Sequence, residues 1–169
     1  MIIMKNLEIR RFLSLTLGLV VFLSLASTSH LTRTDKEPNE LNKINWLTIE
    51  EVETLSEKEP RKVIMDVYTD WCGWCKKMDK TTFADEKVAA YVNENFYAVK
   101  LKADSNDKVT FKGQEFSKGE LARALRVTGY PTVVFFDESF ARFQPVSGFR
   151  PANDFLALLE KFNQTEMSQ

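Results

Sequence analysis

Metal ligands are scarce in this sequence, which has two cysteines and one histidine among 169 residues. A structural zinc site usually takes four cysteine or histidine ligands, so a zinc or iron–sulfur site would need two chains that share ligands. Covalent haem attachment needs a histidine directly after the second cysteine of a Cys-x-x-Cys pair, and Lys76 stands there. We therefore expect neither a metal site nor a bound cofactor in a single chain.

An excess of positive charge is also lacking. The 23 Lys and Arg residues are scattered and are balanced by 24 Asp and Glu, for a formal net charge of −1. Proteins that bind nucleic acids gather basic residues on one face, so we expect no nucleic-acid partner. Hydrophobic residues make up 44% of the chain and aromatic residues 12%. This composition supports a packed core, and the length allows one domain plus a tail.

The apolar stretch at residues 12–23 is shorter than the roughly 20 residues that a membrane-spanning helix needs. It follows three basic residues and precedes the small-x-small pattern Ser24-Leu25-Ala26. Positive, apolar and small residues in this order are typical of an export signal. We therefore predict a signal peptide over residues 1–26 and an exported, periplasmic protein. If the signal is not cleaved, the alternative is a membrane-tethered protein.

A change of composition marks where the folded domain begins. Residues 27–43 are polar, contain one proline and show no periodicity, so we predict a flexible tether there and give His30 within it no role. Thr48-x-x-Glu51 is a capping box, followed by apolar residues at helical spacing. We predict a domain over residues 44–163 and a tail over residues 164–169.

Within the domain, apolar runs and helical patterns alternate, which predicts an α/β fold with a mixed sheet. Pro60 and Gly129 are expected to end helices, and Pro151 is expected at the first position of the last one. The predicted strands are Val63–Tyr68, Tyr97–Asp104, Tyr130–Asp137 and Ala141–Val146, with a hairpin over Val109–Phe116. Three of the predicted helices follow Thr48, Cys72 and Ser117, and two begin at Asp85 and Pro151.

The two cysteines, Cys72 and Cys75, lie where the run Val63–Tyr68 gives way to a helical segment. At a helix N-terminus, unpaired N–H groups and the helix dipole stabilise a thiolate, which is the reactive form of cysteine. Disulfides persist in exported proteins, but a bridge over two intervening residues restricts the unfolded chain very little. A redox role is therefore favoured over a structural staple, with Cys72 as the nucleophile nearest solvent and Cys75 as the resolving cysteine.

Trp71-Cys72-Gly73-Trp74-Cys75-Lys76 resembles the active site of the thioredoxin superfamily. Asp66 lies six residues before Cys72, where that family has a buried acid, although the strand pattern alone leaves open one wet face. Residues 127–132 are similar to the family's cis-proline loop, and Lys100 and Gly148 match a lysine and a glycine of the family. The resemblance covers residues 44–162 and implies a thioredoxin-like fold, with a central mixed β-sheet flanked by helices.

The resemblance also implies a role for each site residue. Asp66 would accept the proton of Cys75, Lys100 would moderate the pKa of Asp66, and Pro131 would be cis and pair its backbone with an extended substrate. Trp71 would form a lip over the disulfide. Trp74 would face partners, although a packing role stays open for both tryptophans.

Among thioredoxin-related proteins, the segment around Cys72 resembles exported bacterial members and is also similar to the C-terminal domain of the membrane thiol:disulfide interchange protein. Trp74 replaces the proline of ordinary thioredoxin, so the family's reduction potential does not carry over. The insertion at residues 107–118 is longer than in plain thioredoxin and is a candidate surface for a specific partner.

We therefore expect an exported thiol–disulfide oxidoreductase that reduces protein disulfides through its Cys-Gly-Trp-Cys site. Its substrates would be exported proteins that contain disulfides, and a membrane or other thiol donor would supply the electrons. We expect a monomer. The alternative is a thioredoxin-like binding module that recognises extended segments beside Pro131 without redox turnover.

Overall fold

The computed structural model describes residues 43–165. The predicted export signal, most of the tether with His30, and residues 166–169 lie outside them, and the predicted domain limits stay predictions. In the described part of the chain, no helix is both long enough and apolar enough to cross a membrane.

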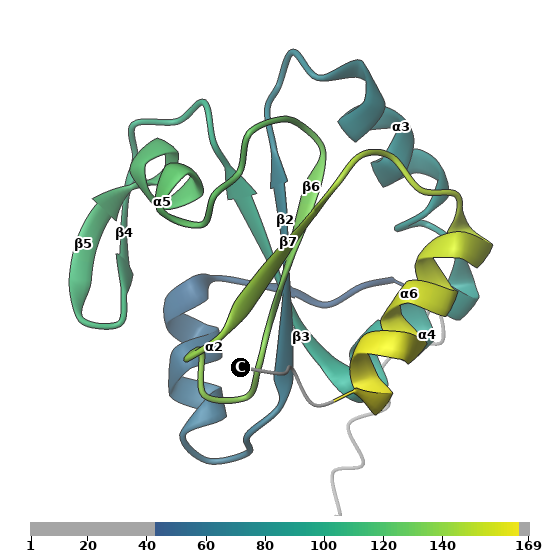
Figure 1. The fold of residues 1–169 in the computed structure, drawn as a ribbon, viewed down its shortest axis with the longest axis horizontal. Coiled ribbons are helices and arrows are strands. Elements are labelled where there is room, and N and C mark those ends of the chain that lie inside the picture. The colour runs from purple at the N-terminus through teal and green to yellow at the C-terminus, as the bar shows by residue number, and fades with distance from the viewer. Residues whose placement is uncertain (1–42, 166–169) are drawn as a thin grey trace, which may run out of the picture. The chain divides into compact units, whose positions relative to one another are not determined.

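Five strands form the central sheet in the order β1-β3-β2-β6-β7 (Figure 1). Strands β1, β3 and β2 run parallel, whereas β6 is antiparallel to β2 and β7 is antiparallel to β6. A separate two-stranded hairpin is formed by β4 and β5. The strands are β1 (Trp46–Leu47), β2 (Lys62–Tyr68), β3 (Phe96–Lys102), β4 (Lys108–Phe111), β5 (Gln114–Ser117), β6 (Thr132–Phe136) and β7 (Phe143–Ser147).

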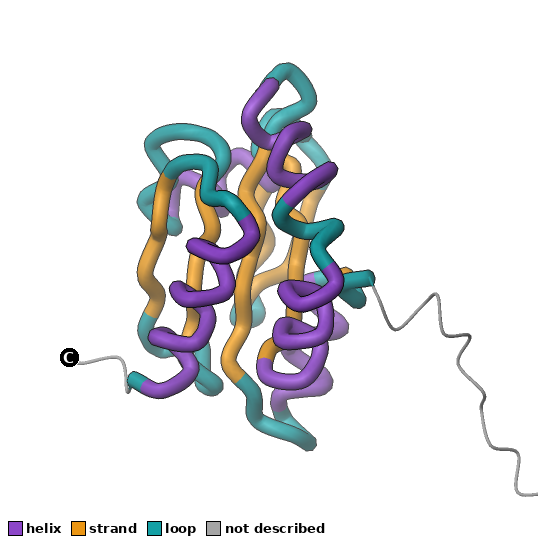
Figure 2. Tube along the Cα trace, turned by 90° about the vertical axis from the view of Figure 1, so that its right-hand side faces the viewer, coloured by secondary structure: helices purple, strands orange, loops and turns teal. Residues whose placement is uncertain are grey.

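Helices cover both faces of the sheet, which gives three layers (Figures 1 and 2). Helices α2 and α5 pack on one face, and α3, α4 and α6 pack on the other, each group in its own apolar cluster. The helices are α2 (Ile49–Ser56), α3 (Gly73–Thr81), α4 (Glu86–Asn95), α5 (Lys118–Ala124) and α6 (Ala152–Gln164).

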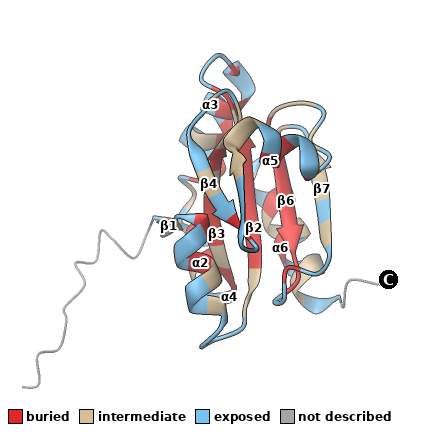
Figure 3. Ribbon diagram, turned by 90° about the vertical axis from the view of Figure 1, so that its left-hand side faces the viewer, coloured by how far each residue is buried: buried red, intermediate tan, exposed pale blue. Residues whose placement is uncertain are grey.

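Strand β2 lies in the middle of the sheet and is buried on both faces (Figure 3). Val63, Met65 and Val67 pack toward α2 and α5, while Ile64 packs toward α3, α4 and α6. Asp66 shares the side of Ile64, because side chains alternate along a strand, and is 3% exposed. A wet face for this strand is therefore wrong: helices cover both of its sides.

The predicted hairpin is confirmed, with Lys112 and Gly113 in its two-residue turn. Both have positive φ, 53° and 73°, as the turn that matches strand twist requires. Carboxylates of α2 anchor it to the domain, since Glu50 accepts the Thr110 N–H at 2.9 Å and Glu53 accepts the Lys112 N–H at 2.7 Å. The insertion is thus fixed against α2.

Three helix ends differ from the sequence prediction. Helix α2 ends at Ser56, before Pro60, and α5 ends at Ala124, before Gly129. Arg126 takes a left-handed φ of 60° and has already turned the chain out of α5. Pro151 is the N-cap of α6 rather than its first residue. Strand β1 was not predicted, because two residues carry no periodicity and β1 is defined by its pairing with β3.

Candidate active site

Cys72 and Cys75 form a disulfide at the N-terminus of α3, with their Cα atoms 5.3 Å apart. Cys72 is the N-cap of the helix, and its sulfur accepts the backbone N–H of Cys75 at 3.1 Å. Its own N–H donates to the Thr69 carbonyl at 3.2 Å, which ties the turn to the end of β2. The predicted strand-to-helix position is confirmed. Cys72 is 5% exposed and Cys75 is 3% exposed, so in the disulfide form solvent access barely distinguishes them.

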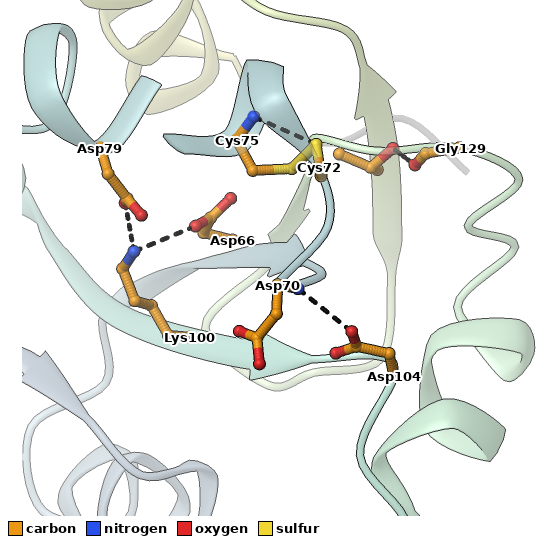
Figure 4. Close-up of a disulfide and its surroundings, with 9 residues drawn as sticks. Asp66, Asp70, Cys72, Cys75, Asp79, Lys100, Asp104 and Gly129 are labelled. Carbon is orange, nitrogen blue, oxygen red and sulfur yellow. Dashed lines mark hydrogen bonds and ion pairs between the residues drawn. A yellow bond between two sulfur atoms is a disulfide. The ribbon is translucent and has the colours of Figure 1, made fainter. Parts of the chain in front are cut away.

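Asp66 lies beneath the disulfide, on the neighbouring strand β2 (Figure 4). Its Oδ2 is 3.5 Å from the Lys100 ammonium, since the two residues are register partners in β2 and β3. Its Oδ1 is buried and has no hydrogen-bond partner among the described residues. Burial raises the pKa of Asp66 to about 7, against the opposing effect of Lys100. A carboxyl group with this pKa exchanges a proton near neutral pH.

Sequence reasoning missed a third charged residue, Asp79. Lys100 forms an ion pair with Asp79 as well as with Asp66, so the ammonium lies between two carboxylates (Figure 4). The charge of Asp79 adds to the rise in the pKa of Asp66. The sequence did hold a signal, because Asp79 follows Cys75 by four residues and therefore lies on the same face of α3.

The loop before β6 lies beside the cysteine turn. The Tyr130–Pro131 peptide bond is cis, as the resemblance implied. The Tyr130 ring meets the Trp71 ring edge-on, with centroids 5.7 Å apart. The Pro131 carbonyl accepts the N–H of Gly148 at 2.8 Å, and Gly148 has a φ of 97°, which favours glycine.

Trp71 and Trp74 flank the disulfide and are 72% and 57% exposed. Trp74 contacts Phe149, with ring centroids 5.3 Å apart. Neither tryptophan belongs to the buried core, but each packs on an aromatic neighbour, Trp71 on Tyr130 and Trp74 on Phe149. Their functional roles stay predictions. Among residues 43–165, no group of three or more His, Cys, Asp or Glu residues is placed to hold a metal ion.

A family model described as a thioredoxin-like domain matches residues 49–163. The chain belongs to this family. Its thioredoxin-like fold is also similar to that of a thioredoxin from Thermus thermophilus, with 25% identity, a TM-score of 0.57, and coverage of 71% of this chain and 87% of that one. The C-terminal domain of DsbD from Neisseria meningitidis, in its oxidised form, has the same fold, with 24% identity, a TM-score of 0.52, and coverage of 66% and 90%.

Curated relatives in this thioredoxin-like family include thiol:disulfide interchange proteins named DsbD. The protein from Actinobacillus pleuropneumoniae is 34% identical over 126 residues, which is 69% of this chain and 20% of that protein. The protein from Pectobacterium atrosepticum is 37% identical over 108 residues, or 63% and 17%. The chain thus spans about a fifth of the length of these relatives. Together with the disulfide at α3, these matches support thiol–disulfide oxidoreductase chemistry in general.

The thioredoxin-like site can therefore do two things. Once its disulfide is reduced, it can exchange with the disulfide of a partner, because Cys72 lies at a helix N-terminus that stabilises a thiolate. It can also move a proton, because Asp66 has one free oxygen directly below the cysteines (Figure 4). Lys100 lowers the pKa of Asp66 and Asp79 raises it.

Proposed function

We propose that this domain is an exported protein-disulfide reductase, in which Cys72 and Cys75 carry the electrons. One observation carries the proposal: a disulfide at the N-cap of α3 lies over a buried acid with one unpartnered oxygen. A structural disulfide has no need of a proton acceptor beneath it. Thiol exchange does, because the resolving cysteine must lose its proton before it attacks.

The reaction starts from the reduced pair. The Cys72 thiolate, held by the Cys75 N–H, attacks one sulfur of the partner disulfide, and the other partner sulfur leaves as a thiolate that takes a proton from water. The product is a mixed disulfide between Cys72 and the partner.

Resolution uses the buried acid. The thiol proton of Cys75 passes to the free Oδ1 of Asp66, and the new thiolate attacks the sulfur of Cys72. The mixed disulfide breaks, the second partner sulfur leaves as a thiolate that takes a proton from water, and two electrons have moved from the cysteine pair to the partner. The proton on Asp66 then returns to solvent.

Electrons would flow from the cysteine pair to the partner disulfide. This reducing direction requires a thiol donor, bound to the membrane or free, that reduces Cys72–Cys75 again after each turnover. Export to the periplasm and a monomeric state belong to the proposal, and the N-terminal signal pattern supports export. The substrates would be exported proteins with accessible disulfides, which fits the name of the curated relatives, thiol:disulfide interchange proteins.

Insulin reduction by dithiothreitol tests the activity. The chain should accelerate it, and Cys72→Ser should abolish the acceleration, whereas Cys75→Ser should accumulate the mixed disulfide. Turnover that is undiminished in Cys72→Ser would contradict the proposal. Equilibration with glutathione then tests direction, because a reductase should have a potential of about −200 mV or lower and an oxidant one near −120 mV.

The second candidate is a binding module without turnover. The exposed side chains of Trp71, which packs on Tyr130 of the Pro131 loop, and of Trp74 favour it. A Cys72→Ser, Cys75→Ser double variant that binds a natural partner as well as the unaltered chain, together with no insulin reduction by that unaltered chain, would establish it.

A further inference from the structure

The side of the disulfide formed by α3 carries exposed aromatic and basic groups together. Trp74 is 57% exposed although it stands between the two cysteines, and its ring packs at 5.3 Å on the half-buried Phe149. The Lys77 ammonium lies 4.9 Å from the centroid of the Trp74 ring and 5.0 Å from that of Phe149. We call these three residues the Trp74 surface.

Phe149 fixes the Trp74 surface in place. The loop between β7 and α6 brings Phe149 to α3 (Figure 1), and the Thr82 hydroxyl at the end of α3 donates to the Arg150 carbonyl at the next position. Lys77 spans both rings, so the two aromatic side chains and the ammonium form one preformed patch. A partner that buries it loses little side-chain freedom on binding.

The fully exposed charged residues of α3 are all basic. The solvent-facing positions of α3 carry Lys76, Lys77 and Lys80, and none of the three has an ion-pair partner within residues 43–165. The single acid of the helix, Asp79, is paired with Lys100. A neighbouring carboxylate would therefore meet three uncompensated ammonium groups.

The opposite side of the disulfide differs. There Trp71 packs on Tyr130, and the nearby charges are Asp70 and Asp104, joined through the Asp70 N–H, with Lys102 paired to Asp70. Among the described residues, no lysine or arginine lies over the Trp71 ring, whereas the Lys77 ammonium lies over the Trp74 ring. Beside the disulfide, the Trp74 surface therefore combines an exposed indole with a lysine in direct contact with it.

We propose that the Trp74 surface selects the partners of the exchange: it binds an extended partner segment that has an apolar side chain and a carboxylate close to its disulfide cysteine. The apolar side chain packs on Trp74 and Phe149, and the carboxylate faces Lys77, with Lys76 and Lys80 adding to the attraction. Burial of apolar area supplies affinity, and the charges favour acidic over basic segments. This inference rests on the proposed thiol exchange and names its substrate class.

Two peptides of equal length test the proposal. Each has one cysteine held as a mixed disulfide with 2-nitro-5-thiobenzoate, flanked on both sides by phenylalanine and then by either glutamate or lysine. The Cys72 thiolate attacks the peptide sulfur and releases the coloured thiolate. Cys75 then frees the peptide as a thiol while the Cys72–Cys75 disulfide forms. With the reduced full chain at low ionic strength, the glutamate peptide should react about fivefold faster, the factor that one close pair of unit charges gives in water.

Charge reversal supplies the matched variants. Lys77→Glu should remove or invert the preference, whereas Lys58→Glu, an equal change in the turn after α2 at the far end of the domain (Figure 1), should keep it. Salt should weaken the preference of the unaltered chain. A glutamate peptide with glycine in place of phenylalanine should react more slowly with the unaltered chain, and Trp74→Ala should reduce that difference.

Equal rates for the two charged peptides would overturn the proposal, as would a loss of preference in Lys58→Glu as large as in Lys77→Glu. The failure of the proposed function looks different. In that case, the reduced chain would release thiolate from neither peptide and would not reduce 2-hydroxyethyl disulfide, and the substrate proposal would fall with it.

Discussion

Two buried aspartates at different places on the same sheet behave in opposite ways. Asp66 in β2 and Asp137 at the end of β6 are 3% and 4% exposed. The pKa of Asp66 is raised to about 7. Burial also acts to raise the pKa of Asp137, but hydrogen bonds from Arg142, Ser139 and Ala141 outweigh it and hold that pKa below its usual value.

The difference lies in the number of donors around each carboxylate. Oδ1 of Asp137 accepts the N–H and hydroxyl of Ser139 and the N–H of Ala141, and Oδ2 accepts the N–H and the Nε of Arg142. Asp66 has one cation at 3.5 Å, and its other oxygen has no hydrogen-bond partner within residues 43–165. Hydrogen bonds to the charged form favour it, whereas burial alone disfavours it. Asp137 therefore holds the turn after β6 together through its hydrogen bonds, whereas the carboxyl group of Asp66 at the cysteine site can take up a proton near neutral pH.

Replacement of Asp66 should have the largest effect on stability. Because its folded pKa lies above the ordinary value near 4, its stabilising contribution is complete below pH 4 and is lost as the pH rises to about 7. Between pH 5 and pH 8 the unaltered chain should lose about 3 kcal/mol of unfolding free energy that Asp66→Asn does not lose. Urea unfolding of the oxidised proteins at both pH values measures this, and parallel profiles for the two proteins would contradict it.

Replacement of Asp137 should change the pH dependence of stability in the opposite direction. Asp137→Ala leaves the hydrogen-bond donors of the turn without an acceptor, which should cost about 2 kcal/mol of unfolding free energy at pH 7. Because the folded pKa of Asp137 is lowered, its contribution exists above pH 4 and disappears as the pH falls through that pKa. The deficit of the variant should therefore shrink in acid. Glu160→Ala, at an exposed position of α6, is the control and should change stability by less than about 0.5 kcal/mol.

The surroundings of these two aspartates could be predicted from the sequence to different extents. Apolar residues flank Asp66 on both sides within Lys62–Tyr68, so an alternating pattern could not say which face it occupied, and only the family resemblance placed it in the core. The residue pattern predicted the α/β class and the position of the cysteines between a strand and a helix, whereas the resemblance added the thioredoxin-like fold and the cis bond before Pro131. Asp137 was predicted only as the end of a strand, because its role depends on a turn conformation that brings five donors to one carboxylate.

Contacts between elements account for what was missed at the site. Asp79 belongs to it because Lys100, on the other side of the α3–sheet interface, reaches both acids. A pattern along one helix does not contain that information, although the spacing from Cys75 placed Asp79 on the correct face. The early end of α5 is similar, since Arg126 takes the left-handed conformation that glycine usually provides.

Removal of the Lys100 ammonium should widen the difference between the pKa values of Asp66 and Asp137. Lys100→Met takes away the charge and the hydrogen bond that oppose burial, so the pKa of Asp66 should rise above 7. The carboxyl carbon of Asp66, followed by NMR in a pH titration of the oxidised protein, reports this. Lys102→Met is the matched control two residues along β3, where the lysine pairs with Asp70 instead, and it should shift the titration less. A fall in the pKa of Asp66 in Lys100→Met would contradict the assignment.

Removal of Asp79 should narrow the difference between the pKa values of Asp66 and Asp137, and this is the smallest effect we expect. Its negative charge helps to raise the pKa of Asp66, so Asp79→Asn should lower that pKa, opposite to the effect of Lys100→Met. The shift is small because the Asp79 side chain is 39% exposed and solvent screens it. The same NMR titration measures it. An upward shift would mean that Asp79 acts mainly by holding the Lys100 ammonium near Asp66, because its loss would then let that cation move away. The sign alone therefore decides whether Asp79 acts on the buried acid through its charge or through the position of Lys100.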